Sequence, residues 1–165
     1  MKVILITVPE VSGRSNRKMA EATKEDTLGH VMSSPVVSVT PKDTLRAAAK
    51  KMVKHGIGAV MVLDGNKPVG ILTERDITKQ SIKANGTMKK SVKLAMSKSL
   101  VTAPPTMPIQ QALELMLKNK ISRLPILDAG DLGGIVTDKD LMRWVLRVSY
   151  EPNVPKHIQA ILDSR

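Results

Sequence analysis

The sequence of 165 residues contains no cysteine and no phenylalanine, and its aromatic residues are Trp144 and Tyr150. Without cysteine there can be no disulfide, no thiolate zinc site and no cysteine nucleophile. The scarcity of aromatic rings excludes the stacking platforms that commonly hold single-stranded nucleic acid. The apolar run near the start, "MKVILITVP", is too short for a secretory signal or a membrane span. We therefore expect a cytoplasmic protein with no membrane partner.

Acidic residues are also few, so the net charge is +11. The balance of basic and acidic residues is 5 − 4 = +1 for residues 1–27, 11 − 4 = +7 for 28–91 and 10 − 7 = +3 for 92–165. The excess lies mainly between residues 28 and 91, on a predicted helix and near a predicted linker: Lys42, Arg46, Lys50, Lys51, Lys54, Lys79, Lys83, Lys89 and Lys90. A solvated helix face is the favoured interpretation, and a patch for nucleic acid or polyphosphate is the alternative.

The sequence contains an internal duplication. Residues 28–77 align with 92–141 without a gap, and 14 of the 50 pairs are identical. A match of this length predicts two copies of one unit, which we expect to form a closed pseudo-twofold pair. The predicted organisation is an extension of uncertain structure at 1–27, repeats at 28–84 and 92–148, a linker at 85–91, and a tail at 149–165 with a short helix near Pro155.

Both copies show the same order of predicted elements. An extended segment precedes an amphipathic helix, whose apolar positions recur at i, i+3, i+4, i+7 and i+8: Leu45, Ala48, Ala49, Met52 and Val53, then Ile109, Ala112, Leu113, Met116 and Leu117. The segments "AVMVLD" and "LPILD" predict buried strands, each followed by a turn and a second strand. Helices are predicted from about 74 to 83 and from about 138 to 148. The predicted fold is α+β, with two β-α-β-β-α repeats packed sheet to sheet.

A Gly-x-x-Thr-x-x-Asp motif follows the second strand of each copy, as "GILTERD" at 70–76 and "GIVTDKD" at 134–140. One interpretation is a helix cap, in which the threonine hydroxyl and the carboxylate satisfy each other's backbone amides. Capping explains Thr73, Asp76, Thr137 and Asp140 but gives no reason for the glycine. The other interpretation is a nucleotide site. Helix-start amides and the hydroxyl would bind phosphate, the carboxylate would hold a ribose diol, and the glycine would admit backbone or ligand.

These motifs, together with "GIGAVMVLDGNKPVGILTERDI" and "ISRLPILDAGDLGGIVTDKDL", resemble a tandem pair of CBS domains, or Bateman module. The resemblance covers about residues 28 to 148. It implies two repeats packed sheet against sheet about a pseudo-twofold axis. It also implies two clefts that take AMP, ADP, ATP or S-adenosylmethionine as regulatory ligands, and association into a homodimer.

The resemblance also implies roles for individual residues. Thr73 and Thr137 match the hydroxyl that contacts phosphate, and Asp76 and Asp140 match the carboxylate that holds the ribose. The residues expected around the adenine are Ile57, Gly58, Ala59, Ile121, Ser122 and Arg123, with Val37 and Val101 as an apolar floor. Arg123 and Lys120 stand where the first copy has Ala59 and Gly56, so the cleft that Arg123 faces is expected to be the better polyphosphate site. An exposed Arg123 paired with Asp128 or Asp138 is the alternative.

The sequence contains no recognisable set of catalytic residues. It has no Gly-x-Ser-x-Gly elbow, no phosphate-binding Walker loop and no metal-ligand spacing among His30, His55 and His157. We expect no enzyme, no catalytic cofactor and no metal. The leading hypothesis is a regulatory module that senses cellular energy through an adenine nucleotide and signals to a separate partner protein. The alternatives are an S-adenosylmethionine sensor, a nucleic-acid-binding protein that uses the basic first repeat, and a structural dimer whose Thr-x-x-Asp motifs are only helix caps.

Overall fold

The computed structural model describes residues 26–83 and 85–150, with the isolated positions 159 and 163. The predicted extension at 1–27 therefore falls almost wholly outside the described residues, as does the helix predicted near Pro155.

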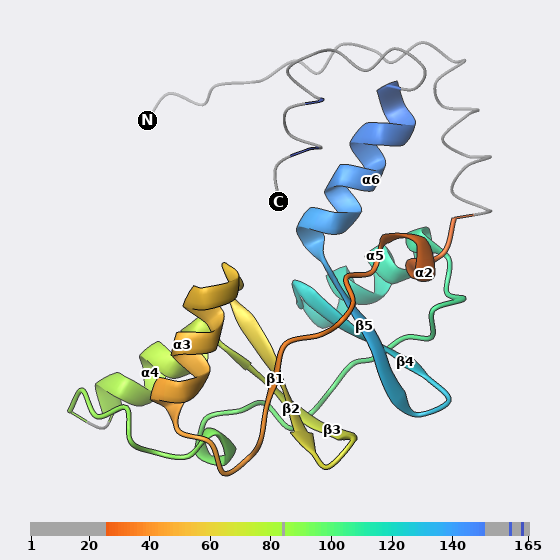
Figure 1. Ribbon diagram of the computed structural model, residues 1–165. Helices are drawn as coiled ribbons and strands as arrows, with labels where there is room; N and C mark the ends of the chain where they lie inside the picture. Colours follow the sequence, from red (N-terminus) through yellow and green to blue (C-terminus); the bar gives the residue numbers. More distant parts are fainter. Residues whose placement is uncertain (1–25, 84, 151–158, 160–162, 164–165) are drawn as a thin grey trace, which may run out of the picture.

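The first repeat is a three-stranded sheet with two helices. Strand β1 (Ser38–Val39) runs parallel to β2 (Ala59–Asp64), and β2 pairs antiparallel with β3 (Lys67–Thr73), in the order β1-β2-β3. Helices α3 (Leu45–His55) and α4 (Glu74–Lys83) contact each other and lie on the same side of this sheet (Figure 1).

The second repeat has the same plan. Strands β4 (Arg123–Asp128) and β5 (Asp131–Thr137) form the hairpin, and helices α5 (Ile109–Asn119) and α6 (Asp138–Tyr150) accompany it. A single parallel bridge between Ala103 and Ile126 stands where β1 pairs with β2 in the first repeat. Strands β3 and β5 contact each other across the pair. The predicted α+β fold of two β-α-β-β-α repeats is confirmed.

The faces that the first helix of each repeat buries are narrower than predicted. Leu45, Ala48 and Met52 are buried in α3, and so are their counterparts Ile109, Ala112 and Met116 in α5. Val53 and Leu117, however, are 82% and 77% exposed, so their assignment to the buried stripe was wrong. Each is one residue, or about 100° of rotation, beyond a buried methionine. That rotation carries both side chains past the edge of the sheet that the helix covers.

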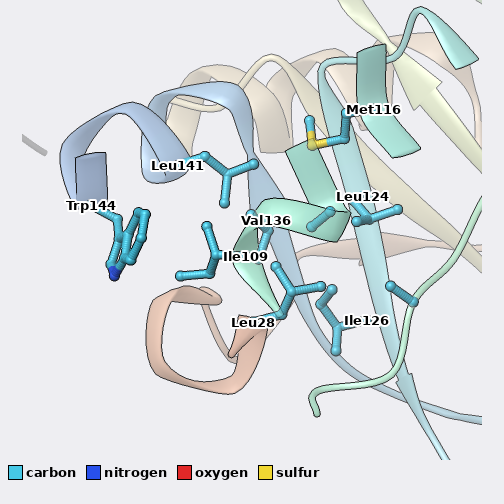
Figure 2. Packing of buried hydrophobic residues seen from close by; sticks show 10 residues of the cluster. Leu28, Ile109, Met116, Leu124, Ile126, Val136, Leu141 and Trp144 are labelled. Atoms are coloured by element: carbon cyan, nitrogen blue, oxygen red, sulfur yellow. The ribbon is translucent and has the colours of Figure 1, made fainter. Parts of the chain in front are cut away.

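The leading segments of the two repeats are exchanged. Helix α2 (Leu28–Val31) and the 3₁₀ turn η1 (Val92–Leu94) are equivalent in the duplication. Leu28 is buried in the core of the second repeat, in the cluster that also contains Ile109, Ile126 and Trp144 (Figure 2). Val92 is buried in the core of the first repeat. Neither hydrophobic core is complete without a segment that the sequence alignment assigns to the other copy.

Backbone hydrogen bonds hold both exchanged segments in place. The bonds of one segment correspond to those of the other by the same offset of 64 residues that relates the repeats. Leu28 N–H donates to Met107 O at 3.0 Å, and Val92 N–H donates to Asp43 O at 2.8 Å. One residue further on, Gly29 N–H reaches Pro105 O at 2.9 Å and Lys93 N–H reaches Pro41 O at 3.1 Å. The two repeats are therefore interlocked through equivalent contacts.

Candidate functional site

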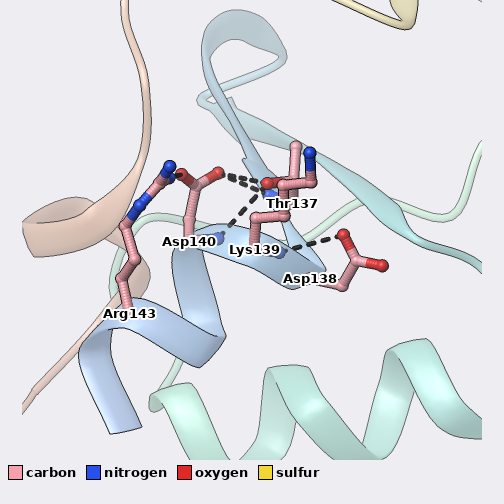
Figure 3. A network of polar contacts seen from close by, with 5 residues as sticks. All are labelled: Thr137, Asp138, Lys139, Asp140 and Arg143. Atoms are coloured by element: carbon pink, nitrogen blue, oxygen red, sulfur yellow. Dashed lines mark hydrogen bonds and ion pairs between the residues drawn. The ribbon is translucent and has the colours of Figure 1, made fainter. Parts of the chain in front are cut away.

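Each Thr-x-x-Asp motif forms a compact corner between a strand and a helix. In the first corner, Thr73 ends β3 and Asp76 lies in the first turn of α4. Thr73 N–H and its hydroxyl donate to Asp76 Oδ2 at 3.0 and 2.6 Å, and Asp76 N–H donates to Thr73 Oγ1 at 3.2 Å. In the second corner, Thr137 and Asp140 make the same three bonds at 2.8, 2.6 and 3.3 Å (Figure 3). The predicted caps are present in both repeats.

The two corners differ in the surroundings of the carboxylate oxygen that takes no part in the cap, which is Oδ1 of the aspartate. Asp140 Oδ1 lies 3.4 Å from Arg143 Nη1, in an ion pair whose side chains are 29% exposed for Arg143 and 19% for Asp140 (Figure 3). The first repeat has Lys79 at the place of Arg143, and Lys79 is exposed. Within the described residues, Asp76 Oδ1 receives no hydrogen bond. The first corner therefore presents an acceptor that the second corner uses internally.

The backbone N–H groups at the starts of α4 and α6 also differ, and again the first corner has the group without an internal partner among the described residues. Glu74 N–H and Asp138 N–H each donate at 3.2 Å, to Gly58 O and Ser122 O respectively. Lys139 N–H donates to the side chain of Asp138 at 2.9 Å. Its counterpart, Arg75 N–H, has no acceptor in the described part of the chain. Within the part of the chain that the structure describes, the first corner thus has one open donor and one open acceptor that the second corner lacks.

The glycine of each motif is explained by the exchanged segments. A Cβ on Gly70 would lie 2.8 Å from Ser97 O and 2.9 Å from Met96 Sδ, while one on Gly134 would lie 2.6 Å from Met32 Sδ. The residue after each of these methionines forms a two-way backbone bridge with the other repeat, Ser33 with Ile135 and Ser97 with Ile71. Of the two expected occupants of this space, backbone or ligand, the structure shows the protein itself.

Arg123 reaches from the second repeat to the first corner. Its Nη2 lies 2.7 Å from where a Cβ on Gly58 would stand, and Glu74 Oε2 lies 3.2 Å from the same point. The side chains of Arg123 and Glu74 therefore both approach Gly58, at the start of α4. The alternative pairing of Arg123 with Asp128 or Asp138 is not among the ion pairs of the described residues. Lys120, by contrast, is exposed at the end of α5.

The remaining predicted site residues are partly core. Ile57 and Val37 are half-buried against the first core, and Ile121 and Val101 against the second. Ala59 is 8% exposed, Gly58 is half-buried and Ser122 is exposed. Packing alone accounts for the four branched residues, whereas Gly58 and Ser122 lie at accessible ends of β2 and β4.

Sequence reasoning missed four residues that contribute to these corners. Arg143 lies three residues after Asp140, a helical spacing that predicts contact. Met32 and Met96 were an identical pair in the internal alignment and received no role. Glu74 gave no signal in the sequence because it occupies a variable position of the repeated motif, between Thr73 and Asp76.

The described residues show neither a membrane span nor a metal cluster. None of their helices is both long and apolar enough to cross a membrane. They also contain no cluster of three or more His, Asp or Glu side chains arranged to hold a metal ion.

The chain is thus a duplicated, interlocked β-α-β-β-α unit with a polar corner in each copy, the architecture of a paired binding module. The CBS domain family model matches residues 28–83 and 90–147, so the chain belongs to the CBS domain family. A CBS pair is a regulatory ligand-binding module.

Similar proteins include both stand-alone pairs and regions of enzymes. The CBS domain-containing protein YhcV of Bacillus subtilis is 36% identical over 67% of this chain and 79% of its own. Inosine-5′-monophosphate dehydrogenase of Korarchaeum cryptofilum is 37% identical over 64% of this chain, but the match covers 21% of the enzyme. Resemblance to that enzyme is therefore limited to a minor part of it.

Solved structures agree with this assignment. A CBS-domain protein from Agrobacterium tumefaciens superposes with a TM-score of 0.66 at 28% identity, over 72% of this chain and 98% of its own. A CBS domain pair solved in complex with 5′-methylthioadenosine and S-adenosyl-L-methionine also has a TM-score of 0.66, at 29% identity, over 72% of this chain and 94% of its own. Adenosyl ligands are thus bound by a close structural neighbour.

Proposed function

We propose that this chain is a regulatory module that binds an adenine nucleotide, AMP, ADP or ATP, at its two corners and reports occupancy to a separate partner protein. The observation that carries the proposal is the first corner, where a carboxylate oxygen, a helix-start amide and an arginine from the other repeat converge. The adenosyl ligands of the structural neighbour support the ligand class. The chemistry is binding without catalysis, and it needs no catalytic cofactor.

The ribose contact follows from the geometry of the carboxylate. Asp76 Oδ2 already accepts two bonds from Thr73, at 3.0 and 2.6 Å. Its Oδ1 is the atom that can accept from a ribose hydroxyl. The phosphate contact is more demanding, because the single hydroxyl proton of Thr73 is donated to Asp76. A phosphate that accepts from Thr73 must replace that bond, so binding at the corner rearranges the cap.

The phosphate side of the first corner is provided by Arg123. Its guanidinium can form bidentate, charge-assisted hydrogen bonds to phosphate oxygens. Its Nη2 lies beside Gly58, and Glu74 Oε2 approaches the same point at the start of α4. For the second corner, the residue equivalent to Arg123 is Ala59, and Asp140 Oδ1 is paired with Arg143. We therefore assign the tighter polyphosphate site to the first corner.

Calorimetric titration with AMP, ADP, ATP, S-adenosylmethionine and NADH tests the proposal. Tightest binding by S-adenosylmethionine, with no nucleotide bound, would assign the module to the alternative ligand. Asp76→Ala should weaken the tighter site at least tenfold, whereas the matched Asp140→Ala should affect the weaker site. Arg123→Gln should reduce affinity for ATP and leave affinity for adenosine within about twofold. Normal nucleotide binding by both aspartate variants would refute the assignment of the ribose contact.

Signalling requires two states that the ligand distinguishes. The exchanged segments supply a route, because Ser97 pairs with Ile71, two residues before Thr73, and Ser33 pairs with Ile135, two before Thr137. Rearrangement of a cap therefore bears directly on the contact between repeats. We also propose a homodimer formed through the outer helices, where Val53, Ile82, Leu117 and Met142 are exposed. Sedimentation at several protein concentrations measures dimer formation, and its comparison with and without nucleotide measures the change that the ligand causes.

A further inference from the structure

Gly58 directly precedes β2, and its backbone conformation does not require a glycine. Its φ lies outside the left-handed region that favours glycine. The second repeat has Ser122 at the equivalent position, and the carbonyl groups of both residues accept a backbone N–H, from the first residue of α4 or of α6, at 3.2 Å. The fold therefore accepts a side chain at this position, so the glycine of the first repeat needs another explanation.

The space beside Gly58 is occupied by two charged side chains, one from each repeat. A Cβ on Gly58 would lie 2.7 Å from Arg123 Nη2 and 3.2 Å from Glu74 Oε2. Nonbonded heavy atoms prefer separations of about 3.5 to 4 Å, so the guanidinium could not keep its position beside a residue with a Cβ. The space left by Gly58 thus sets where the guanidinium of Arg123 lies.

Arg123 reaches this space from the second repeat. Its backbone is paired with Thr137 in the β4–β5 hairpin, whereas its guanidinium lies at the start of α4. The residue that the duplication places in the reverse direction is Ala59, which is too short to cross, and there the position equivalent to Gly58 holds exposed Ser122. A side chain is present where no arginine crosses and absent where one does.

We infer that Gly58 is a positioning residue for Arg123 and thereby determines the selectivity of the first corner for phosphorylated over unphosphorylated adenosine. This role rests on the proposed function, because it concerns the same site. The guanidinium offers bidentate, charge-assisted hydrogen bonds to phosphate oxygens, which adenosine lacks. Glu74 cannot take over this contact, because an ionised carboxylate only accepts hydrogen bonds. Displacement of Arg123 should therefore lower the affinity for phosphate and spare the contacts to the nucleoside.

The test replaces Gly58 with the residue that the second repeat already carries. Calorimetric titration of the full chain should show that Gly58→Ser lowers the ratio of ATP affinity to adenosine affinity, at the tighter site, by about fivefold or more. The thermal midpoint should change by less than about 3 °C, since the atoms nearest to the new Cβ are the ends of flexible side chains. An equal loss of affinity for both ligands would overturn the inference, because Gly58 would then only leave room for the nucleoside.

The matched control is Gly133→Ser in β5. Gly133 also has a φ outside the left-handed region, and a Cβ on it would lie 3.8 Å from its nearest neighbour, Ile126 O. The first repeat has Val69 at the equivalent position, so a side chain fits there. The affinity ratio should change by less than about twofold in this variant. A change as large as that in Gly58→Ser would contradict a specific role of Gly58.

Two double variants identify the group that the serine displaces. In Arg123→Gln the affinity ratio is already low, so the addition of Gly58→Ser should change it by less than about twofold. In Glu74→Gln the addition of Gly58→Ser should still lower the ratio, by about threefold or more. A full effect in Arg123→Gln, or none in Glu74→Gln, would overturn the assignment to Arg123.

Failure of this role and failure of the proposed function give different results. If the native chain binds ATP and Gly58→Ser leaves the affinity ratio unchanged, Gly58 has no positioning role and the nucleotide site stands. If the native chain binds no adenine nucleotide, the proposed function fails, and inorganic tripolyphosphate then probes Arg123 directly. Weaker binding of tripolyphosphate by Gly58→Ser than by the native chain supports the role of Gly58, whereas equal affinity or no binding overturns it.

Discussion

The two repeats share a backbone plan but differ in what surrounds their corners. Both keep the same three Thr–Asp hydrogen bonds, with distances that agree within 0.2 Å. Around that constant element, the first corner leaves a carboxylate oxygen and an amide open beside Arg123, while the second satisfies the corresponding atoms with Arg143 and Asp138. Both repeats thus fold with the constant element in place. The variable groups are therefore the ones through which the two proposed sites would differ in ligand and affinity.

The largest effect is expected where the exchange is buried. Leu28→Ala should destabilise the protein by about 3 kcal/mol, because a fully buried leucine leaves a cavity. Its counterpart Val92→Ala removes less volume and should cost about 1.5 kcal/mol. Urea denaturation gives both values. Trp144, the single tryptophan, lies in the same cluster as Leu28. The native fluorescence should therefore change in Leu28→Ala and stay constant in Val92→Ala, and the reverse pattern would contradict the exchange.

The two motif glycines should differ in how well an added methyl group is tolerated. Gly70→Ala forces the new Cβ against Ser97 O, a backbone atom held in a bridge, and should cost about 2 kcal/mol. The three atoms nearest to a Cβ on Gly134 all belong to the side chain of Met32, the nearest being its flexible sulfur, so Gly134→Ala should cost about 1 kcal/mol.

A second substitution sharpens this comparison. Met32→Ala should largely suppress the extra cost of Gly134→Ala, whereas Met96→Ala should suppress only part of the cost of Gly70→Ala, because Ser97 O remains. Thermal denaturation of each double-mutant cycle measures the coupling. Equal rescue at both sites would show that the methionines alone explain the two glycines.

The sequence predicted the repeats, the order of elements and the caps, because these depend on local spacing. Residues 70–76 and 134–140 contain every atom of the Thr–Asp box, so the motif alone was sufficient. The exchange was not predicted, because Leu28 and Val92 align perfectly well while packing into opposite cores. The glycine also had no local explanation, since its neighbours, Met32 and Met96, come from segments 102 and 26 residues away in the chain. The position of Arg123 beside Gly58 likewise depends on how the repeats pack.

The carboxylates should contribute unequally to stability. Asp76→Ala removes a cap and should cost about 1 kcal/mol. Asp140→Ala removes the same cap and also the partner of Arg143, so it should cost about 0.5 kcal/mol more, a small increment because the pair is partly exposed. Urea denaturation compares the two, and Arg143→Gln serves as the control for the ion pair. If Asp76→Ala proved the more damaging variant, the open oxygen of Asp76 would need a structural partner.

The smallest effect concerns the end of the first helix in each repeat. Helix α3 ends at Gly56 with φ of 62°, and α5 ends at Lys120 with φ of 53°, so a lysine occupies the left-handed conformation that glycine adopts without strain. Lys120→Gly should stabilise the protein by about 0.5 kcal/mol, since relief of strain exceeds the added freedom of the unfolded chain. The reverse change, Gly56→Lys, should destabilise it by about 1 kcal/mol. Differential scanning calorimetry resolves both. ATP affinity then decides why the lysine is kept. If Lys120→Gly is more stable but binds ATP less tightly, the strained cation belongs to a phosphate site. If the affinity is unchanged, the difference between Gly56 and Lys120 has no role in ligand binding.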